Sequence, residues 1–187
     1  MILAASRYRM ENTVQFVACN HSRSRHILLM IMLALATGAR WSEIYNLKRS
    51  HVKGNSIQFV DTKDDDVRIL VISDQLAEAL RKHEPHSPYE LFPKSRTAFD
   101  EVVKRANLQL PKGQKAHVLR HTFAVNFMEE GGNIHTLQKI LGHSDINTTA
   151  IYLAFAPTTF QQMLVLTPLA TDGINVLDTL KNQNVPS

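Results

Sequence analysis

The sequence predicts an α+β domain that is mainly α-helical and carries a small antiparallel three-stranded sheet. Three observations predict this class. Long stretches repeat apolar residues at helical spacing, two short neighbouring runs alternate in the manner of strands, and strands do not alternate with helices along the chain. Because regular alternation of strands and helices is the pattern of a parallel sheet, its absence favours pairing between strands that are close in sequence.

Two short runs rich in isoleucine and valine predict a β-hairpin. They are Ser56 to Thr62 and Val67 to Ile72, and the polar turn Lys63–Asp66 separates them. A shorter run, His51 to Lys53, precedes them closely enough to add a third strand.

Helices are indicated by apolar spacing and by the residues that start and end them. Serine and aspartate accept hydrogen bonds from a first turn, whereas glycine and proline end a helix. Gly38 separates two helices, and Ser144 is expected to cap one helical segment that leads to Tyr152. The predicted helices are Arg9 to Asn20, Ser22 or Ser24 to Ala36, Trp41 to Leu47, Ser73 or Asp74 to the residue before Pro85, Ser95 to Asn107, Ala116 to Glu130, His135 to Leu141, and Pro157 to Leu166.

The chain of 187 residues suits one domain, predicted at residues 1–167, followed by a polar tail at residues 168–187. A single cysteine, Cys19, rules out an internal disulfide. The apolar run from Ile27 to Ala36 is too short to span a bilayer, and no secretory signal is visible. These features favour an intracellular location.

Positive charge is concentrated near the N-terminus. The net charge is +4, and residues 1–60 hold eight Lys and Arg against two Asp and Glu, whereas residues 61–100 hold six against nine. A basic first third suits the phosphates of a nucleic acid. Taken alone, the same charges suit an ordinary solvated surface equally well.

The stretch from Ala116 to Tyr152 contains side chains that suit attack on a DNA phosphodiester without a metal ion. Such an attack needs a nucleophile, an acceptor for its proton, positive charge at the phosphoryl oxygens and a proton for the leaving oxygen. Tyr152 offers a phenol, and His117 and His143 offer imidazoles. Arg120 offers a planar guanidinium that can bind two phosphate oxygens, and on a helix it shares a face with His117, three residues earlier.

Each of these residues is weak evidence alone. A His-x-x-Arg pair is usually surface charge, and a tyrosine flanked by isoleucine and leucine usually belongs to a core. Two further cations far upstream complete the set, because Arg40 follows the predicted helix break at Gly38 and Lys63 begins the hairpin turn.

Together these residues and the motifs around them resemble the tyrosine recombinase family of site-specific DNA recombinases, and most closely the integrases of temperate phages. The resemblance runs from about Ile27 to Pro168 and implies the catalytic-domain fold of that family, with a role in DNA integration and recombination. It rests on motifs that occur in the family's order, namely ATGARWSE, the Thr-Lys turn, ISD, LPKGQ, HVLRHTF, GGNI, LGHS, and the tyrosine followed by FAP. In place of the histidine that relatives often carry two positions after the tyrosine, this chain has Ala154.

The resemblance implies that Tyr152 attacks a DNA phosphate and forms a 3′-phosphotyrosyl link, with no metal, ATP or other cofactor. It implies that His117 takes the phenolic proton or positions the phosphate, and that Lys63 protonates the leaving 5′-oxygen. The carboxylates at residues 64–66 follow that lysine directly and should raise its pKa and repel DNA. Either they point into solvent or the turn moves when DNA binds.

The resemblance also implies three residues that hold the transition-state charge, Arg40, Arg120 and His143. Glu43, in the pattern T-G-x-R-x-x-E, is expected to orient Arg40 by ion pairing without carrying a proton. His121 is interpreted as a structural residue behind Arg120.

The implied partners are double-stranded DNA attachment sites, three further copies of the chain in a homo-tetramer, and accessory DNA-bending proteins. Relatives carry an N-terminal core-binding domain that closes over the DNA. This chain is expected to lack that domain and so to be a fragment. The tail at residues 168–187 is expected to dock on a neighbouring protomer, and the location is expected to be the nucleoid in the cytoplasm of a bacterial host.

Two other activities fit the same residues. A type IB topoisomerase-like enzyme would relax DNA by the same phosphotyrosine chemistry, and a non-catalytic DNA-binding regulator would use the histidines and arginines only to contact phosphate. A degenerate recombinase copy is a third interpretation, against which the presence of all six reacting residues argues. Strand exchange between two marked duplexes separates the recombinase from the topoisomerase, and Tyr152→Phe separates either enzyme from the regulator.

Overall fold

A computed structural model describes residues 25–60, 67–94, 97–105, 107, 109–110, 114 and 116–157. Four predictions lie outside the described residues, namely the helix at residues 9–20, the hairpin turn with Lys63, the helix beyond Pro157 and the tail at residues 168–187. Within the described ranges, none of the helices has the length and apolar character needed to cross a bilayer.

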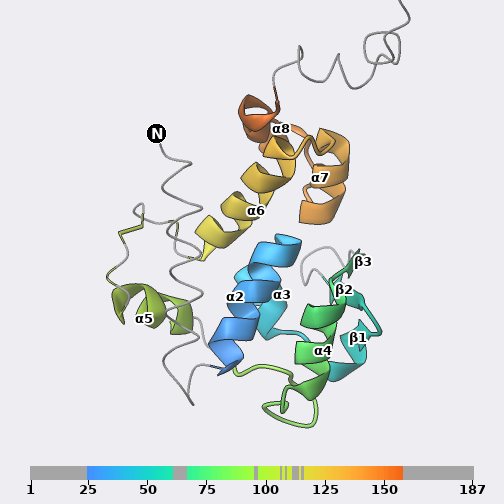
Figure 1. The fold of residues 1–187 in the computed structure, drawn as a ribbon, viewed down its shortest axis with the longest axis vertical. Helices are drawn as coiled ribbons and strands as arrows, with labels where there is room; N and C mark the ends of the chain where they lie inside the picture. The colour runs from blue at the N-terminus through green and yellow to red at the C-terminus, as the bar shows by residue number, and fades with distance from the viewer. Residues whose placement is uncertain are drawn as a thin grey trace, which may run out of the picture.

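The described fold is mostly helical with a small sheet at one side of the helices, which confirms the predicted class (Figure 1). Most element bounds agree with the predictions to within one helical turn. In chain order the elements are α2 (Arg25–Thr37), α3 (Trp41–Tyr45), the 3-10 helix η1 (Arg49–His51), β1 (Val52–Lys53), β2 (Ser56–Val60), β3 (Val67–Val71), α4 (Asp74–Lys82), α5 (Ala98–Arg105), α6 (His117–Glu129), α7 (Ile134–Leu141), α8 (Asn147–Ala150) and the 3-10 helix η2 (Ile151–Phe155).

The sheet is antiparallel with the strand order β1-β2-β3. On β2, Ile57 and Phe59 are buried, and their cross-strand partners on β3 are Leu70 and Arg68. Directly paired residues point to the same side of a sheet. The register therefore brings Arg68 to the core-facing side of β3, while the alternate residues of that strand, among them Ile69, are exposed.

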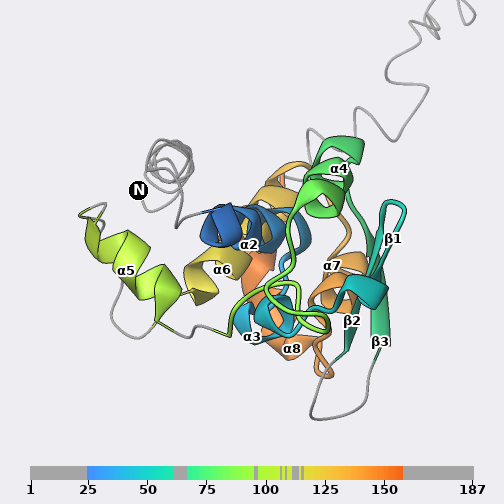
Figure 2. The ribbon, with the colours of Figure 1, turned by 90° about the horizontal axis from the view of Figure 1, so that it is seen from below.

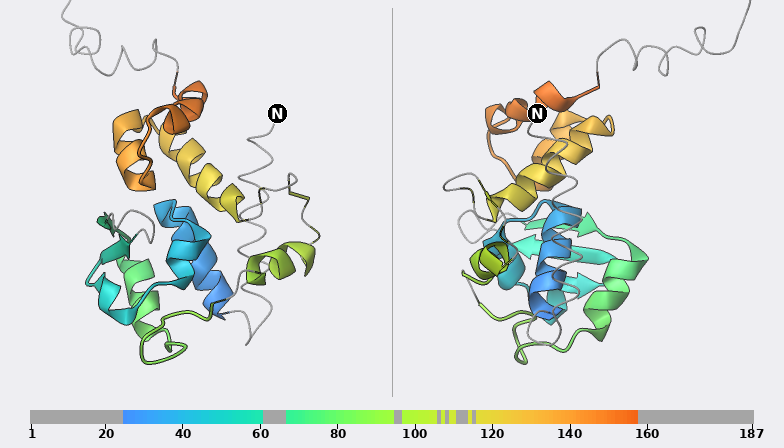
Figure 3. Two further views of the ribbon diagram at one scale, coloured as in Figure 1. Left: turned by 180° about the vertical axis from the view of Figure 1, so that it is seen from behind. Right: turned by 60° about the vertical axis from the view of Figure 1, so that its left-hand side comes forward.

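The described residues form two hydrophobic clusters. The large cluster includes Met30 of α2 and Phe59 of β2 and extends to α3, α4 and α5. The small cluster includes Leu137 of α7 and Tyr152 of η2. Figure 1 shows α6, α7 and α8 at one end of the molecule and α2, α3, α4 and the sheet at the other. Figure 2, seen from below, shows the sheet to one side of α2 and α3, and Figure 3 shows the two ends again from other sides.

Helix α6 belongs to both clusters. Its N-terminal half packs on α2 and contributes Leu119 to the large cluster, and its C-terminal half contributes Ala124 and Met128 to the small cluster. Arg120 lies on α6 one residue after Leu119, so it sits where the two clusters meet.

The predicted cap at Ser144 is wrong. Ser144 is exposed, and the carboxylate of Asp145 accepts the backbone N–H of Asn147 at 2.9 Å. An ionised carboxylate is a stronger acceptor than a hydroxyl, so this turn is built around Asp145. The single helical segment expected before Tyr152 is also replaced, because the short helix α8 ends at Ala150 and a 3-10 turn carries the tyrosine.

Candidate active site at the junction of the two clusters

A glycine bend at the end of α2 sets the position of Arg40. Gly38 has a φ of 65°, and a Cβ placed on it would lie 2.5 Å from Cδ1 of Phe123. Only glycine fits such a backbone against so close a neighbour. After this bend, Arg40 stands at the start of α3 with extended backbone, and its N–H donates to Oε2 of Glu43 at 2.6 Å.

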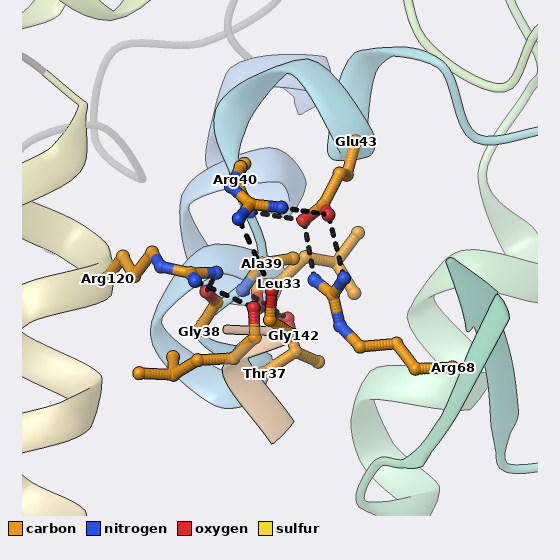
Figure 4. A network of polar contacts seen from close by, with 10 residues as sticks. Leu33, Thr37, Gly38, Ala39, Arg40, Glu43, Arg68, Arg120 and Gly142 are labelled. Atoms are coloured by element: carbon orange, nitrogen blue, oxygen red, sulfur yellow. Dashed lines mark hydrogen bonds and ion pairs between the residues drawn. The ribbon is translucent and has the colours of Figure 1, made fainter. Parts of the chain in front are cut away.

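Glu43 is buried between two guanidinium groups, as Figure 4 shows. Arg40 Nη1 donates to its Oε1 at 3.2 Å, and Arg68 donates through Nη1 to Oε1 at 2.7 Å and through Nη2 to Oε2 at 2.5 Å. Burial of the carboxylate works to raise the pKa of Glu43, but hydrogen bonding and the charges of Arg68 and Arg40 outweigh it and lower that pKa. Glu43 is therefore ionised, which confirms the predicted ion pairing with Arg40.

Arg120 joins the end of α2 to the end of α7. It is only 6% exposed, and its guanidinium donates to the carbonyl oxygen of Gly38 at 2.9 Å and to that of Leu141 at 2.6 Å. Burial, helped by the nearby charge of Arg40, lowers the pKa of Arg120 to about 10, so the side chain stays cationic at neutral pH.

The two predicted phosphate-binding arginines meet at the C-terminal end of α7. Arg40 Nη2 donates to the carbonyl oxygen of Gly142 at 3.4 Å, one residue from the Leu141 carbonyl that Arg120 contacts. Figure 4 shows both guanidinium groups approaching this turn. Arg40 and Arg120 are 80 positions apart in the sequence, so their meeting is a product of the fold rather than of local spacing.

His143 is brought to the same turn by Gly142, which closes α7 in the left-handed conformation. Its Nδ1 lies 2.9 Å from the hydroxyl oxygen of Thr149. Burial, followed by the charges of Arg120, Arg40 and Arg68, lowers the pKa of His143 to about 4. At neutral pH the imidazole is therefore uncharged and acts through hydrogen bonding.

Tyr152 is 4% exposed and lies against His121, whose Nδ1 is 2.5 Å from the phenolic oxygen. Burial raises the pKa of Tyr152, although the charge of Arg120 acts in the opposite direction. Burial, and then the charges of His117 and Arg120, lower the pKa of His121, which favours a neutral imidazole that can accept the phenolic hydrogen. The sequence interpretation placed His121 behind Arg120 and missed this contact.

One predicted site residue, His117, makes no described hydrogen bond to this group, and another, Lys63, cannot be placed relative to it. His117 lies at the start of α6 with an exposed side chain, whereas Arg120, on the next turn, is buried. The described effect of His117 on the group is electrostatic, because its charge lowers the pKa of His121. Lys63 lies outside the described residues. The structure thus gathers Arg40, Arg120, His143 and Tyr152, and adds His121 and Arg68.

Comparisons with known proteins identify the family of this fold. The model of the family described as "Phage integrase family" matches residues 8–158. The integrase of Haemophilus phage HP1 (strain HP1c1) is 43% identical over 152 residues, which are 81% of this chain and 44% of that integrase. The solved catalytic domain of bacteriophage HP1 integrase superposes with a TM-score of 0.73 at 41% identity and covers 89% of this chain and 94% of that one.

Similarity extends to more distant proteins, in sequence and in fold. The tyrosine recombinase XerA of Saccharolobus solfataricus is 34% identical over 139 residues, which are 72% of this chain and 47% of XerA. The Tn1549 transposon integrase, solved in complex with circular intermediate DNA, has a TM-score of 0.67 at 22% identity, covering 86% of this chain and 66% of that one. The fold is thus that of the catalytic domains of tyrosine recombinases. The chain belongs to the phage integrase family, and it spans less than half the length of the HP1 integrase and of XerA.

Proposed function

We propose that this chain is the catalytic domain of a site-specific DNA recombinase that cuts and rejoins DNA through a 3′-phosphotyrosyl intermediate, without metal or ATP. The observation that carries the proposal is the meeting of Arg40, Arg120 and His143 at the end of α7, close enough to Tyr152 for the charge of Arg120 to act on its phenol. Cations, a neutral imidazole and a phenol in one place are what a metal-free phosphoryl transfer requires.

The first step forms one bond to phosphorus and breaks another. The phenolic oxygen of Tyr152 attacks phosphorus, the bond from phosphorus to the 5′-oxygen breaks, and the 3′-phosphate stays esterified to the tyrosine. The phenolic proton goes to an acceptor, and the 5′-oxygen leaves as a hydroxyl after receiving a proton, which we assign to Lys63. Attack by a 5′-hydroxyl reverses the same chemistry, so the ester retains the bond energy needed for rejoining.

Arg40 and Arg120 would hold the nonbridging phosphoryl oxygens, because guanidinium groups offer paired donors to phosphate. Neutral His143 would add a hydrogen bond to the same oxygens. Negative charge on the phosphoryl group grows during attack, so donors that are already fixed in place stabilise the transition state more than the ground state.

Two histidines are candidates to accept the phenolic proton. His117 keeps the role that the family resemblance gives it, with an exposed imidazole that DNA could cover. His121 already contacts the phenolic oxygen and has a lowered pKa, which suits a base that must be unprotonated at neutral pH. We assign the first proton acceptance to His121 and the positioning of the phosphate to His117.

The partners proposed for the whole protein follow from the family. They are double-stranded DNA attachment sites, a homo-tetramer assembled on two such sites, and accessory DNA-bending proteins, in the nucleoid of a bacterial cytoplasm. An N-terminal core-binding domain and docking of residues 168–187 on a neighbouring protomer belong to the same proposal.

A suicide half-site tests the proposal. The chain is incubated with a duplex nicked so that the 5′-hydroxyl product diffuses away, and a species that survives denaturation is measured on a gel. Wild type should form this adduct and Tyr152→Phe should not, while both bind DNA with the same affinity and the same steep loss of affinity at higher salt. Strand exchange between two differently labelled duplexes then separates recombination from relaxation. Binding without any adduct would favour the non-catalytic regulator.

A further inference from the structure

Arg68 is a buried arginine on β3 that lies outside the predicted site residues. Its side chain is 10% exposed, forms the two hydrogen bonds to Glu43 described above, and rests over the ring of Phe59 with Cζ 5.2 Å from the ring centroid. A Cβ placed on Gly142 would lie 3.1 Å from Arg68 Nη1, so this guanidinium also packs against the turn before His143. One side chain therefore contacts both the partner of Arg40 and the end of α7.

The geometry of this contact requires arginine. Both terminal nitrogens bind separate oxygens of Glu43, which is the paired arrangement that a planar guanidinium offers and an ammonium group does not. The oxygens of Glu43 that Arg68 holds are the same two that accept from the side chain and the backbone N–H of Arg40. The orientation of the Glu43 carboxylate, and with it the start of α3, is fixed from the β3 side.

Stability alone is a poor explanation for a charged group in this place. Replacing a buried ion pair with apolar residues of similar volume is often neutral or stabilising, because the ions lose their hydration. The Nε–H of Arg68 is buried and lacks an acceptor among the described residues, and an unsatisfied buried donor is destabilising. The presence of the Arg68 guanidinium in spite of this destabilisation indicates a role other than packing.

Charge balance indicates that reason. Arg40, Arg68 and Arg120 carry three positive charges and Glu43 one negative charge, so the group has a formal net charge of +2 with His143 neutral. A phosphodiester carries one negative charge, and attack by a phenolate adds a second. Within these four side chains, removal of Arg68 would lower the formal net charge from +2 to +1, with Glu43 still paired to Arg40.

We propose that Arg68 is a positioning residue for phosphoryl transfer, which binds Glu43 so that Arg40 remains oriented and electrostatically available to the scissile phosphate. The inference rests on the proposed function. Arg68 acts through Glu43 and Arg40, and it does not touch the DNA. β3 follows the turn that carries Lys63. Arg68 nevertheless acts on the stabilisation of charge at the phosphoryl oxygens and not on proton transfer to the leaving oxygen.

Three suicide substrates distinguish this role from a structural one. The first is an ordinary DNA phosphodiester. The second carries a methylphosphonate at the scissile position, which is uncharged and needs little charge compensation. The third carries a 5′-bridging sulfur, whose thiolate leaves without a proton donor because a thiol is far more acidic than an alcohol. Wild type, Arg68→Gln and Arg68→Lys are compared by the single-turnover rate of covalent adduct formation.

On the ordinary phosphodiester, Arg68→Gln should form the adduct roughly tenfold to a hundredfold more slowly than wild type. This is the loss typical of removing a residue that hydrogen-bonds to and orients a metal-binding side chain, a comparable supporting role. Arg68→Lys, which keeps the charge but loses the paired geometry, should fall between them. The gap between wild type and Arg68→Gln should close on the methylphosphonate and persist on the 5′-sulfur substrate. Arg81→Gln is the matched control, because Arg81 also pairs with a glutamate, Glu78, but is half exposed on α4.

Three results would overturn the inference while wild type still forms the adduct. They are an unchanged rate for Arg68→Gln, an equal loss on all three substrates, and a loss removed by the 5′-sulfur, which would assign Arg68 to the lysine turn. If Arg68→Gln does not fold, as judged by thermal unfolding, Arg68→Lys decides by the same pattern. Absence of an adduct for wild type on every substrate would instead refute the proposed function.

Discussion

Arg40 and Tyr152 lie in the two halves of the site, and different kinds of contact hold them. Arg40 stands on the large-cluster side, where its backbone and side chain both bind a glutamate that Arg68 fixes from β3. Tyr152 stands in the small cluster on a 3-10 turn, and its only described polar contact is the hydrogen bond to His121. The phosphate-binding half is held by a network of ions, and the nucleophile is held by packing and one hydrogen bond.

This difference matches what each half must do. A group that stabilises charge works best when it is fixed before the charge develops, since reorganisation during the reaction would reduce its effect. A nucleophile must instead reach the phosphorus and then stay bonded to it while a strand is exchanged, so it must be able to leave its resting contact. Substitutions on the two sides should therefore have different consequences.

Among substitutions that keep the nucleophile, the largest effect is expected at Arg120, where the two halves meet. Arg120→Lys keeps a positive charge but replaces the two separate nitrogens that donate to the carbonyls of Gly38 and Leu141 with a single ammonium nitrogen. Adduct formation should fall by about 10²–10³, the loss typical of removing a fixed charge-stabilising donor. The single-turnover rate on a suicide half-site measures it. A rate within a few-fold of wild type, with normal thermal stability, would contradict the role of the paired donors.

On the nucleophile side, His121→Phe should slow adduct formation by about a hundredfold, because it keeps a ring beside Tyr152 but removes the proton acceptor. The loss should shrink as the pH rises, since a larger fraction of the phenol is then ionised without help. The pH profile of the single-turnover rate tests this, with His135→Gln, an exposed residue on α7, as the control. A loss that is the same at every pH would reduce His121 to a packing role.

Gly38→Ala should reduce stability by roughly 2 kcal/mol or more, because it adds a left-handed alanine and a contact with Phe123 at the same point. Gly54→Ala is the matched control. Gly54 also has a positive φ, 56°, but open space surrounds it, so only backbone strain is added. Urea unfolding of both variants separates the two contributions. Equal losses of unfolding free energy in the two variants would mean that Phe123 can move away from position 38 without loss of stability.

The smallest effect is a change of stability with pH. The folded pKa of His143 is about 4, below the ordinary value near 6.5, so the unfolded chain binds more protons between these values. The stabilisation is complete above pH 6.5 and is lost as the pH falls towards 4. By pH 5 His143 should contribute a loss of about 1 kcal/mol, since solvent screens a half-buried group. Urea midpoints at pH 7 and pH 5, compared between wild type and His143→Gln, measure it, and a variant with the full wild-type slope would contradict the assignment.

Local signals in the sequence predicted most of the fold. Strand alternation indicated the hairpin at β2 and β3. Ser73 or Asp74 was predicted to start the next helix, and α4 begins at Asp74 with the Ser73 side chain accepting from the N–H of Leu76. Ser144 failed because an aspartate one residue later competes for the same backbone donors. When two neighbouring side chains can each accept a hydrogen bond from the same backbone N–H groups, the local sequence does not reveal which of them will do so.

The site was predicted less completely than the fold. Arg40, Arg120, His143 and Tyr152 were found by motif and are gathered by the structure. Arg120 and His121 are neighbours on one helix. The sequence does not show that Arg120 points to the carbonyl oxygen of Gly38 while His121 points to Tyr152. The roles of His117 and Lys63 stay predictions.

Arg68 was missed for a reason that involves long-range packing. The strand register that places it opposite Phe59 could have been inferred from the hairpin alone. Its reach to Glu43 depends instead on how the sheet packs on α3, and no pattern local to β3 reveals that contact.

A carboxylate shared by two arginines has a consequence for how such sequences diverge. Loss of Glu43 alone would remove the carboxylate that binds both the Arg40 and the Arg68 guanidinium, and loss of Arg68 alone would remove two hydrogen bonds from a buried acid. Positions 43 and 68 should therefore change together over evolutionary time, each tolerating a new residue only after, or alongside, a matching replacement in the other.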